Sequence, residues 1–425
     1  MTDSSRPAAG GAGEWRGHAR GSSEYRRILM ALACAGIATF AQLYSPQGIL
    51  PQIASSLRVT PDQSALLISA ATIGLAVGVL PWSWVADRIG RLPAMRLSLA
   101  AATVLGFAVI VCPSFLGILV LRAGEGIALG GLPALALTYL QEEISPAHSA
   151  LAAGTYVSGT TVGGLLGRII AAPAAAVFGW RGGVGTVVVI AGAATVAFVL
   201  LTPAARGFRR APAEHREPLL RLVGRQLRTP ALLTLFAQGF LLMGGFVTLY
   251  NYLAFRLQAA PFQLPATITA LLFFAYLAGT WSSRRAGSAS ARRGRLAVLL
   301  VSIAVMIAGI LLTLVPSLWV IFIGLVVLTA GFFAAHSIAS GWTAARAVVG
   351  RAQATSLYNL FYYLGSSVVG WAGGVVFTHA GWDATALAVA GLAAIAGCWA
   401  AAVLRSPGSS GATPRTPRLR ESDGR

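Results

Sequence analysis

The sequence predicts an all-α membrane protein with twelve transmembrane helices in two six-helix repeats. Its 425 residues are 56% hydrophobic and only 11% charged, whereas a soluble chain carries roughly 25% charged residues. The apolar residues come in runs close to the ~20 residues that cross the hydrocarbon core of a bilayer. An arginine-rich segment at 83–91 recurs at 287–295, again between two apolar runs. A repeat of this kind indicates a duplicated bundle.

The apolar runs define the expected helices, and prolines such as Pro113, Pro230 and Pro316 lie between them. The first six are expected at 28–50, 63–85, 92–112, 116–139, 149–172 and 181–201. The second six are expected at 231–255, 264–282, 296–315, 317–340, 352–377 and 381–404. The domains are then a disordered N-tail 1–27, a first half 28–201, a linker 202–230, a second half 231–404 and a disordered C-tail 405–425.

The positive charges predict the orientation in the bilayer. The net charge is +19, the chain has no lysine, and 27 arginines fall in segments on the side of the N-terminus against three on the other side. Positive residues collect on the cytoplasmic side of membrane proteins, so both termini and the linker are expected in the cytoplasm. Because these arginines lie in short loops and tails, and not on one folded face, we do not expect nucleic acid as a partner. The lipid bilayer is the expected surroundings.

The internal repeat extends beyond the arginine-rich segment. Leu43-Tyr44 matches Leu249-Tyr250, and Tyr156 with the glycines that follow it matches Tyr362 with its own following glycines. Both pairs are separated by the same 206 residues. Parallel repeats of six helices are the plan of transporters whose halves move about a central site.

At these residues the chain resembles the major facilitator superfamily. That family carries Gly-x-x-x-Asp-Arg-x-Gly-Arg between helices 2 and 3; here Asp87, Arg88, Gly90 and Arg91 match, and Ser83 replaces the leading glycine. The longer runs 43–47, 156–168, 331–337 and 357–367 are similar to the YnfM-type branch of bacterial inner-membrane efflux proteins. The resemblance implies the twelve-helix fold and a monomer in the inner membrane.

The resemblance also implies a gate formed by Asp87, Arg88, Gly90 and Arg91. Asp87 would meet the positively polarised N-terminus of the eleventh span and lock the outward-facing state, while the arginines hold Asp87 and nearby acids. A solvated loop whose arginines only set topology is the alternative.

Arg122, Glu125 and Arg168 are the formal charges expected well inside the spans. Such groups are costly in lipid and usually face the interior with a partner. Arg122 and Glu125 are three residues apart and share a helix face, and Arg168 is expected at a similar depth, so we predict a three-member cluster. It suits a proton carrier or a site for an anionic group, with a structural link between two spans as the alternative.

Other polar residues are candidates for the proton path and the cavity wall. His336 is a second titratable candidate, although a hydrogen-bonded packing histidine, with Ser337 and Ser340 as partners, is the alternative. The expected substrate-binding residues combine aromatic and uncharged polar groups, which suits an amphipathic organic solute: Tyr44, Gln47, Asn251, Asn359 and Tyr362. Tyr44 lies near a span end, where an interfacial anchor is equally expected.

The motifs exclude the common enzyme classes and point to secondary transport. The sequence contains neither a His-Glu-x-x-His zinc motif nor a Walker A loop, so we expect no enzyme, cofactor or metal, and an energy source in an ion gradient. The leading hypothesis is proton-coupled export, by antiport, of a small-molecule substrate through alternating access. An uptake symporter or facilitator is the second hypothesis, and a membrane scaffold or sensor without transport is the third.

Overall fold

The computed structural model describes residues 15, 17–208, 219–347 and 350–405, and these form a bundle of helices. The first half consists of α1 (Ser23–Tyr44), the 3-10 helix η1 (Ser45–Ile49), α2 (Leu50–Leu57), α3 (Pro61–Ile89), α4 (Arg91–Val111), α5 (Phe115–Leu129), α6 (Gly131–Glu143) and α7 (Pro146–Leu201). The second half consists of α8 (Leu219–Leu227), α9 (Pro230–Gln258), α10 (Ala266–Leu271), η2 (Leu272–Ala275), α11 (Tyr276–Arg293), α12 (Arg295–Leu312), α13 (Leu318–Arg346) and α14 (Arg351–Val403).

Ten helical segments of the described chain are long and apolar enough to cross a bilayer. Two of them, α7 with 56 residues and α14 with 53, are each long enough to cross twice. Each contains one glycine with non-helical backbone, Gly179 at φ 71° and Gly381 at φ 74°. Glycine adopts positive φ at little cost, so the chain turns there. Ten segments with two turned back on themselves are consistent with twelve spans.

The helix bounds differ from the sequence prediction at several places. α1 begins at Ser23, inside the predicted N-tail, and the predicted linker contains α8. The predicted helix 28–50 ends at Tyr44, because Pro46 lacks the N–H that would continue the helical hydrogen bonds. α11 continues to Arg293, beyond the predicted end at 282. The rest of the linker, 209–218, and most of the predicted tails lie outside the described residues.

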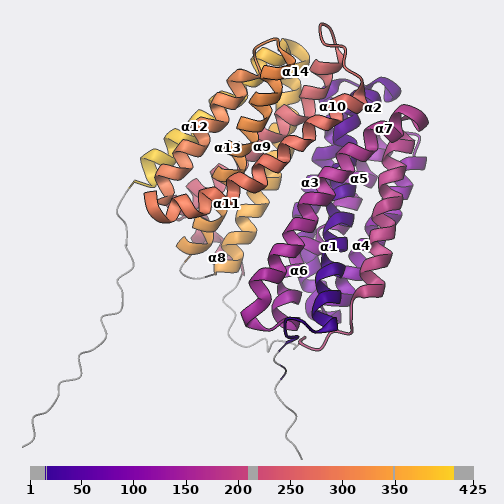
Figure 1. Ribbon diagram of the computed structural model, residues 1–425, viewed down its shortest axis with the longest axis vertical. Helices are drawn as coiled ribbons and strands as arrows, with labels where there is room; N and C mark the ends of the chain where they lie inside the picture. Colours follow the sequence, from indigo (N-terminus) through magenta and orange to yellow (C-terminus); the bar gives the residue numbers. More distant parts are fainter. Residues whose placement is uncertain (1–14, 16, 209–218, 348–349, 406–425) are drawn as a thin grey trace, which may run out of the picture.

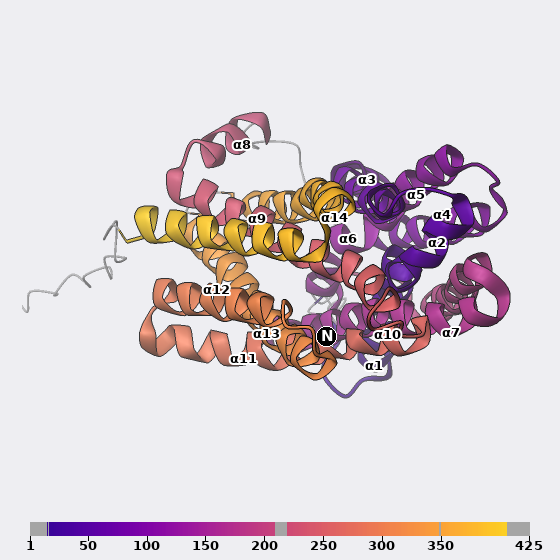
Figure 2. The ribbon, with the colours of Figure 1, turned by 90° about the horizontal axis from the view of Figure 1, so that it is seen from above.

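The helices form two bundles that meet at one end. Figure 1 shows α1–α7 on one side and α8–α14 on the other, with the ribbons converging at the top, near α2 and α10, and diverging at the bottom. We call the top the far end and the bottom, where α1 begins and α3 turns into α4, the tail end. Seen from above, α3 lies beside α14, and α10 beside α7 (Figure 2).

Hydrogen bonds between the halves lie toward the far end. Ser69 Oγ donates to the Ser367 carbonyl over 3.0 Å, and the hydroxyls of Thr72 and Ser367 are 2.6 Å apart. Thr378 Oγ1 donates to Asp62 beside the start of α3. We call Ser69, Thr72 and Ser367 the hydroxyl contact. It joins the far half of α3 to the middle of the first part of α14.

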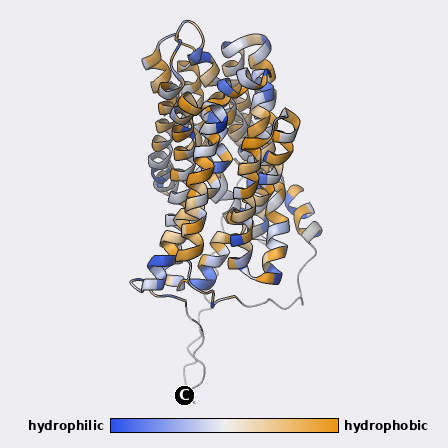
Figure 3. Cartoon of the chain, turned by 90° about the vertical axis from the view of Figure 1, so that its right-hand side faces the viewer, coloured by the Kyte–Doolittle hydropathy of each residue, from blue (hydrophilic) through white to orange (hydrophobic). Residues whose placement is uncertain are grey.

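The surface has the pattern of a membrane protein. Figure 3 shows hydrophobic colours along the long sides of the bundle and hydrophilic colours gathered at the ends. Large apolar side chains such as Val104, Val111 and Trp319 are two-thirds or more exposed. A soluble protein rarely exposes apolar side chains over so wide an area, whereas lipid tails accept them.

The repeated glycines bring helices together within each half. Gly159 and Gly163 of α7 lie directly against the backbone of Ala33 and Ile37 in α1, and Gly365 of α14 lies against Phe240 of α9. A Cβ atom at any of these positions would overlap the neighbouring helix. These glycines hold α7 to α1 and α14 to α9, as small residues do in membrane bundles.

Candidate coupling and substrate site

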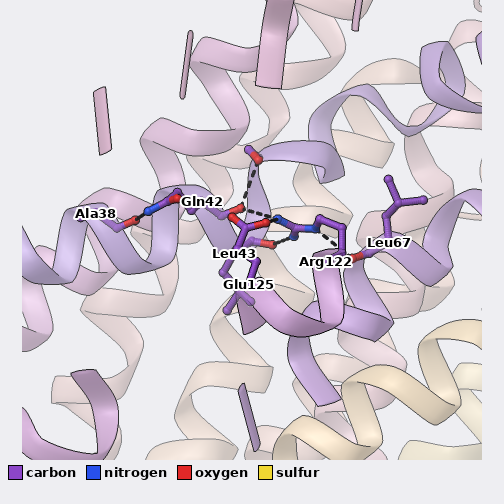
Figure 4. A network of polar contacts seen from close by, with 7 residues as sticks. Ala38, Gln42, Leu43, Leu67, Arg122 and Glu125 are labelled. Carbon is purple, nitrogen blue, oxygen red and sulfur yellow. Dashed lines mark hydrogen bonds and ion pairs between the residues drawn. The ribbon is translucent and has the colours of Figure 1, made fainter. Parts of the chain in front are cut away.

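The break between α1 and η1 exposes backbone carbonyls in the middle of the first half, and Arg122 binds them. The Gln42 carbonyl would normally accept from residue 46, which is a proline without an N–H; it accepts instead from the N–H and the hydroxyl of Ser45 and from Arg122. Arg122 Nη1 donates to Gln42 O over 3.2 Å, Nη2 to Leu43 O over 2.7 Å, and Nε to Leu67 O in α3 over 3.3 Å (Figure 4). The guanidinium thus satisfies the irregular backbone of one span and joins it to the next.

Glu125 completes the Arg122 network. Its Oε2 lies 2.8 Å from Arg122 Nη1, and both side chains are 1% exposed. Glu125 Oε1 is buried and makes no hydrogen bond within the described chain. The predicted pairing of Arg122 with Glu125 is therefore present, and half of the carboxylate has no partner.

Arg168 does not join this pair, so the predicted three-member cluster is wrong. Arg168 Nε donates to Gln47 Oε1 over 2.6 Å, and Nη1 donates to the Gly164 carbonyl one turn back in α7. The helix break separates the two arginines, since Arg122 binds the last carbonyls of α1 and Arg168 binds η1.

Aromatic rings from both halves surround the Arg168 guanidinium. Its Cζ lies 4.1 Å from the ring centre of Tyr44, 4.8 Å from that of Tyr276 and 5.2 Å from that of Phe273. We call Tyr44, Phe273 and Tyr276 the aromatic cage. Ring faces attract a cation at such distances, so the cage partly compensates the buried charge.

Gln47 links the two halves at this depth. Its side-chain amide donates to Asn251 Oδ1 of α9 over 2.6 Å while its oxygen accepts from Arg168. Gln47 and Asn251 are fully buried, and Asn251 Nδ2 has no partner within the described chain. Arg168, Gln47 and Asn251 form a polar row across the interface.

His336 lies among aromatic residues of the second half. Its Nδ1 is 2.9 Å from the Tyr358 hydroxyl, and its ring centre is 4.8 Å from that of Tyr362. Ser337 and Ser340 bond to backbone carbonyls of their own helix and are not its partners. Asn359, predicted beside Tyr362, is exposed.

The arginine-rich turn at the tail end is held by ion pairs within the first half. Arg91 Nη1 lies 2.6 Å from Asp87 Oδ1, and Arg91 Nε lies 3.3 Å from Glu142 Oε1 of α6. Gly90 has φ 94°, which allows the tight turn between α3 and α4. Arg88 stacks on Trp84, with 3.3 Å from Cζ to the ring centre.

The segment before α1 and the segment after α7 both pack against the end of α6 that lies beside this turn. Glu143 is fully buried, and its Oε1 accepts the backbone N–H groups of Arg206 and Gly207 over 2.8 and 2.7 Å. The His18 N–H donates to the Glu143 carbonyl over 2.8 Å. The Arg91 guanidinium also faces the Phe208 ring, so the segment after α7 reaches the ion pairs of the turn.

Several of these residues escaped the sequence analysis. Phe273 and Tyr276 fall where the predicted helix 264–282 is irregular, so its pattern gave no sign of which face they take. Ser69, Thr72 and Ser367 are hydroxyls of a kind common in membrane helices. Within the described chain, no group of three or more His, Cys, Asp or Glu side chains could hold a metal ion.

Comparison with known proteins identifies the family. The family model described as Major Facilitator Superfamily matches residues 32–293. The inner membrane transport protein YnfM of Escherichia coli K12 is 42% identical over 89% of this chain and 90% of its own. The uncharacterized MFS-type transporter YybF of Bacillus subtilis is 38% identical over 85% of this chain and 90% of its own.

A solved structure agrees with the fold. The crystal structure of the peptide transporter POT in complex with sulfate superposes with a TM-score of 0.73, covering 89% of this chain and 94% of that one at 15% identity. The family match, the relatives that align over nearly their whole length and the shared helical architecture lead to one conclusion. The protein is a membrane transporter, not an enzyme, and it belongs to the Major Facilitator Superfamily.

Proposed function

We propose that this protein exports a small organic compound in exchange for protons, and that Glu125 carries the proton. The observation that supports this most directly is the buried carboxylate with one oxygen on Arg122 and one without a partner. A buried acceptor without a hydrogen bond is costly, and a proton on that oxygen would remove the negative charge. An ionisable group within a membrane span is a functional candidate for this reason.

The surroundings of Glu125 allow it to change charge without disturbing Arg122. Three backbone carbonyls accept from Arg122 in addition to Glu125. If Glu125 takes up a proton, the guanidinium keeps those three acceptors. Only the ion pair between Arg122 and Glu125, which both belong to α5, is then weakened. Two of these carbonyls, those of Gln42 and Leu43, belong to the break in the first span, so release of the carboxylate from Arg122 would be felt beside the substrate path.

We place the tail end in the cytoplasm and the protein in the bacterial inner membrane. The arginine bias supports the orientation, and the name of the Escherichia coli relative supports the location. Reporter fusions at Arg405 and near Pro212 should then report a cytoplasmic position. A periplasmic signal at either site would reverse the orientation.

In this orientation the structure would be that of an inward-facing state. The hydrogen bonds between the halves would then close the outer side, and the helices diverge toward the cytoplasm. Asp87, Arg88, Gly90 and Arg91 would act in the opposite, outward-facing state by closing the cytoplasmic side. Tyr44, Gln47, Asn251, Asn359 and Tyr362 remain the proposed substrate-binding residues, and His336 the second proton candidate.

The test of proton coupling compares two assays on one purified variant in proteoliposomes. A counterflow screen of dyes, sugars, amino acids and organic acids first identifies a transported compound. Glu125→Gln should then abolish accumulation driven by a pH gradient but leave exchange intact, because exchange moves no net protons. Glu24→Gln, which changes a carboxylate at the tail-end start of α1, is the matched control and should keep both activities.

The same assays decide between export and the other hypotheses. Accumulation driven by the opposite pH gradient would indicate an uptake symporter, and movement that no gradient drives uphill would indicate a facilitator. If Glu125→Gln still accumulates substrate against its gradient, Glu125 is not the carrier, and His336 becomes the next residue to test.

A further inference from the structure

Arg168 is a buried cation without a buried anion. Its side chain is 3% exposed, and within the described chain no carboxylate lies within 4.0 Å of its guanidinium nitrogens, although Arg122 and Arg91 both have such partners. The aromatic cage and two hydrogen bonds compensate the charge only in part. A charge inside a membrane span normally has a partner, and one that lacks it marks a functional site.

The guanidinium keeps one nitrogen free for a ligand. Nε and Nη1 donate to Gln47 and to the Gly164 carbonyl. Nη2 makes no hydrogen bond to any described residue, yet it is not among the side-chain atoms that are buried without a partner. It therefore reaches accessible space. Nη2 carries two N–H groups, and such donors of a guanidinium suit the oxygens of an oxyanion.

Tyrosine hydroxyls with the same property lie around it. Those of Tyr44, Tyr276, Tyr362 and Tyr363 have no hydrogen-bond partner within the described chain and are likewise absent from the buried unpartnered atoms, whereas that of Tyr156 is among them. The rings of Tyr362 and Tyr363 are 5.2 Å apart, and Tyr363 packs against the buried cluster that contains Tyr44. Together these residues offer a ligand both aromatic ring faces and hydroxyl donors.

We propose that Arg168 and these tyrosines bind the anionic group and the ring of an aromatic organic acid, such as an aromatic carboxylate. This substrate class rests on the proposed transport function and makes it more specific. The oxyanion would supply the counter-charge that Arg168 lacks, and the substrate ring would pack on the tyrosines. A cation would be repelled by Arg168, and a neutral sugar would leave its charge uncompensated.

The location explains how such a substrate would act on both halves. Arg168 and Tyr44 belong to the first half, whereas Tyr276, Tyr362 and Phe273 belong to the second. Gln47 binds Arg168 and also holds Asn251 across the interface. An anion on Nη2 of Arg168 would therefore bind beside the Gln47–Asn251 hydrogen bond that joins the halves.

The test measures binding of 2-naphthoate and of its neutral analogue 2-naphthamide to the purified full-length protein by equilibrium dialysis. We expect 2-naphthoate to bind about tenfold or more tightly than 2-naphthamide, since hydrogen bonds to charged groups are worth that much. Arg168→Gln should abolish the preference. Arg168→Lys should retain part of it, because lysine keeps the charge but not the planar fork.

The matched control is Arg256→Gln. Arg256 also lies over aromatic rings, those of Phe262 and Trp382, and also donates to a backbone carbonyl, that of Thr313, but its contacts are confined to the second half. This variant should bind 2-naphthoate as the wild type does. If Arg168→Gln does not fold, as judged by size-exclusion chromatography, Arg168→Lys and Tyr276→Leu carry the test, and Tyr276→Leu should weaken both ligands.

The outcomes separate this inference from the proposed function. Equal binding of the acid and the amide, absence of 2-naphthoate binding, or an unchanged preference in the Arg168 variants would each overturn the inference. Proton-driven transport of another compound that depends on Glu125 would stand in all three cases. Conversely, Arg168-dependent binding of 2-naphthoate without proton-driven movement would keep the substrate class and overturn the coupling.

Discussion

Arg122 and Arg168 carry the same guanidinium but compensate its burial differently. Arg122 has three carbonyls and a carboxylate, all within the first half. Arg168 has one carbonyl, one amide oxygen and the aromatic cage, which includes residues of the other half. The first arrangement uses all three nitrogens and four of the five N–H donors, and it suits structural support. The second leaves donors free and suits a ligand.

At the residue scale, Arg122→Lys should destabilise the protein even though it keeps the charge. An ammonium has three donors at one point and cannot reach acceptors on three sides, so hydrogen bonds to buried carbonyls are lost at about 1 kcal/mol each. The apparent Tm, followed by tryptophan fluorescence in detergent, should fall clearly. Arg96→Lys is the control, because Arg96 binds two carbonyls over 3.3 and 3.4 Å near the tail end and should change Tm little. Equal Tm values for both variants would contradict the structural role of Arg122.

At the element scale, two local irregularities of the backbone position the candidate sites. The break at Ser45–Ile49 in the first span turns carbonyls toward Arg122 and places Gln47 at the interface. The turn at Gly90 brings α4 back beside α3, so that Arg91 reaches both Asp87 and Glu142. Broken spans are where transporters of this architecture build their sites.

Asp87→Asn tests the turn between α3 and α4. The ion pair of Asp87 with Arg91 is half-exposed and contributes less than about 1 kcal/mol, so folding and membrane insertion should be unaffected. Transport should nevertheless fall strongly, and a cysteine on the cytoplasmic side should label faster, if Asp87 closes that side in the outward-facing state.

Glu142→Gln distinguishes the two roles of this turn. It removes the other acid that Arg91 binds while leaving Asp87 in place. If the ion pairs themselves matter, both variants should lose transport; if Asp87 acts on the eleventh span, only Asp87→Asn should. Full transport activity of Asp87→Asn would show that Asp87 has no role in closing the cytoplasmic side.

At the scale of the whole molecule, a few hydrogen bonds hold the halves together at the far end. The hydroxyl contact uses small side chains whose bonds are worth about 1 kcal/mol each. Such weak bonds can be broken once in every transport cycle, whereas an ion pair buried there would cost more to separate.

Ser367→Ala should therefore shift the molecule toward the state in which the far end is open. It removes the bonds from Ser367 Oγ to Thr72 and to the Ser69 carbonyl, which changes the ratio of the two states by about tenfold. Spin labels at Arg58 and Gln263, in loops of opposite halves, should show a larger population of long distances. Ser302→Ala removes a hydroxyl that bonds only within α12 and should leave the distances unchanged, as should Ser367→Ala if the hydroxyl contact does not hold the far end closed.

The sequence by itself determined the membrane class, the transporter family and the positions of most spans. These depend on the number and order of apolar residues, because the bilayer requires long runs and backbone bonds satisfied within each helix. The ion pair of Arg122 with Glu125 was also predictable, since three residues along one helix fix their proximity.

Only the tertiary structure decided what surrounds Arg168. The sequence placed it with Glu125 by depth alone, but depth does not tell which face of α7 meets which neighbour. The break after Tyr44 and the irregular η2 turn side chains in directions that helical periodicity does not describe. The contacts of Arg168 with Gln47, Tyr44 and Tyr276 join residues more than 100 positions apart. The first two contacts arise from how helices pack within the first half and the third from how the two halves meet, and no local pattern encodes either.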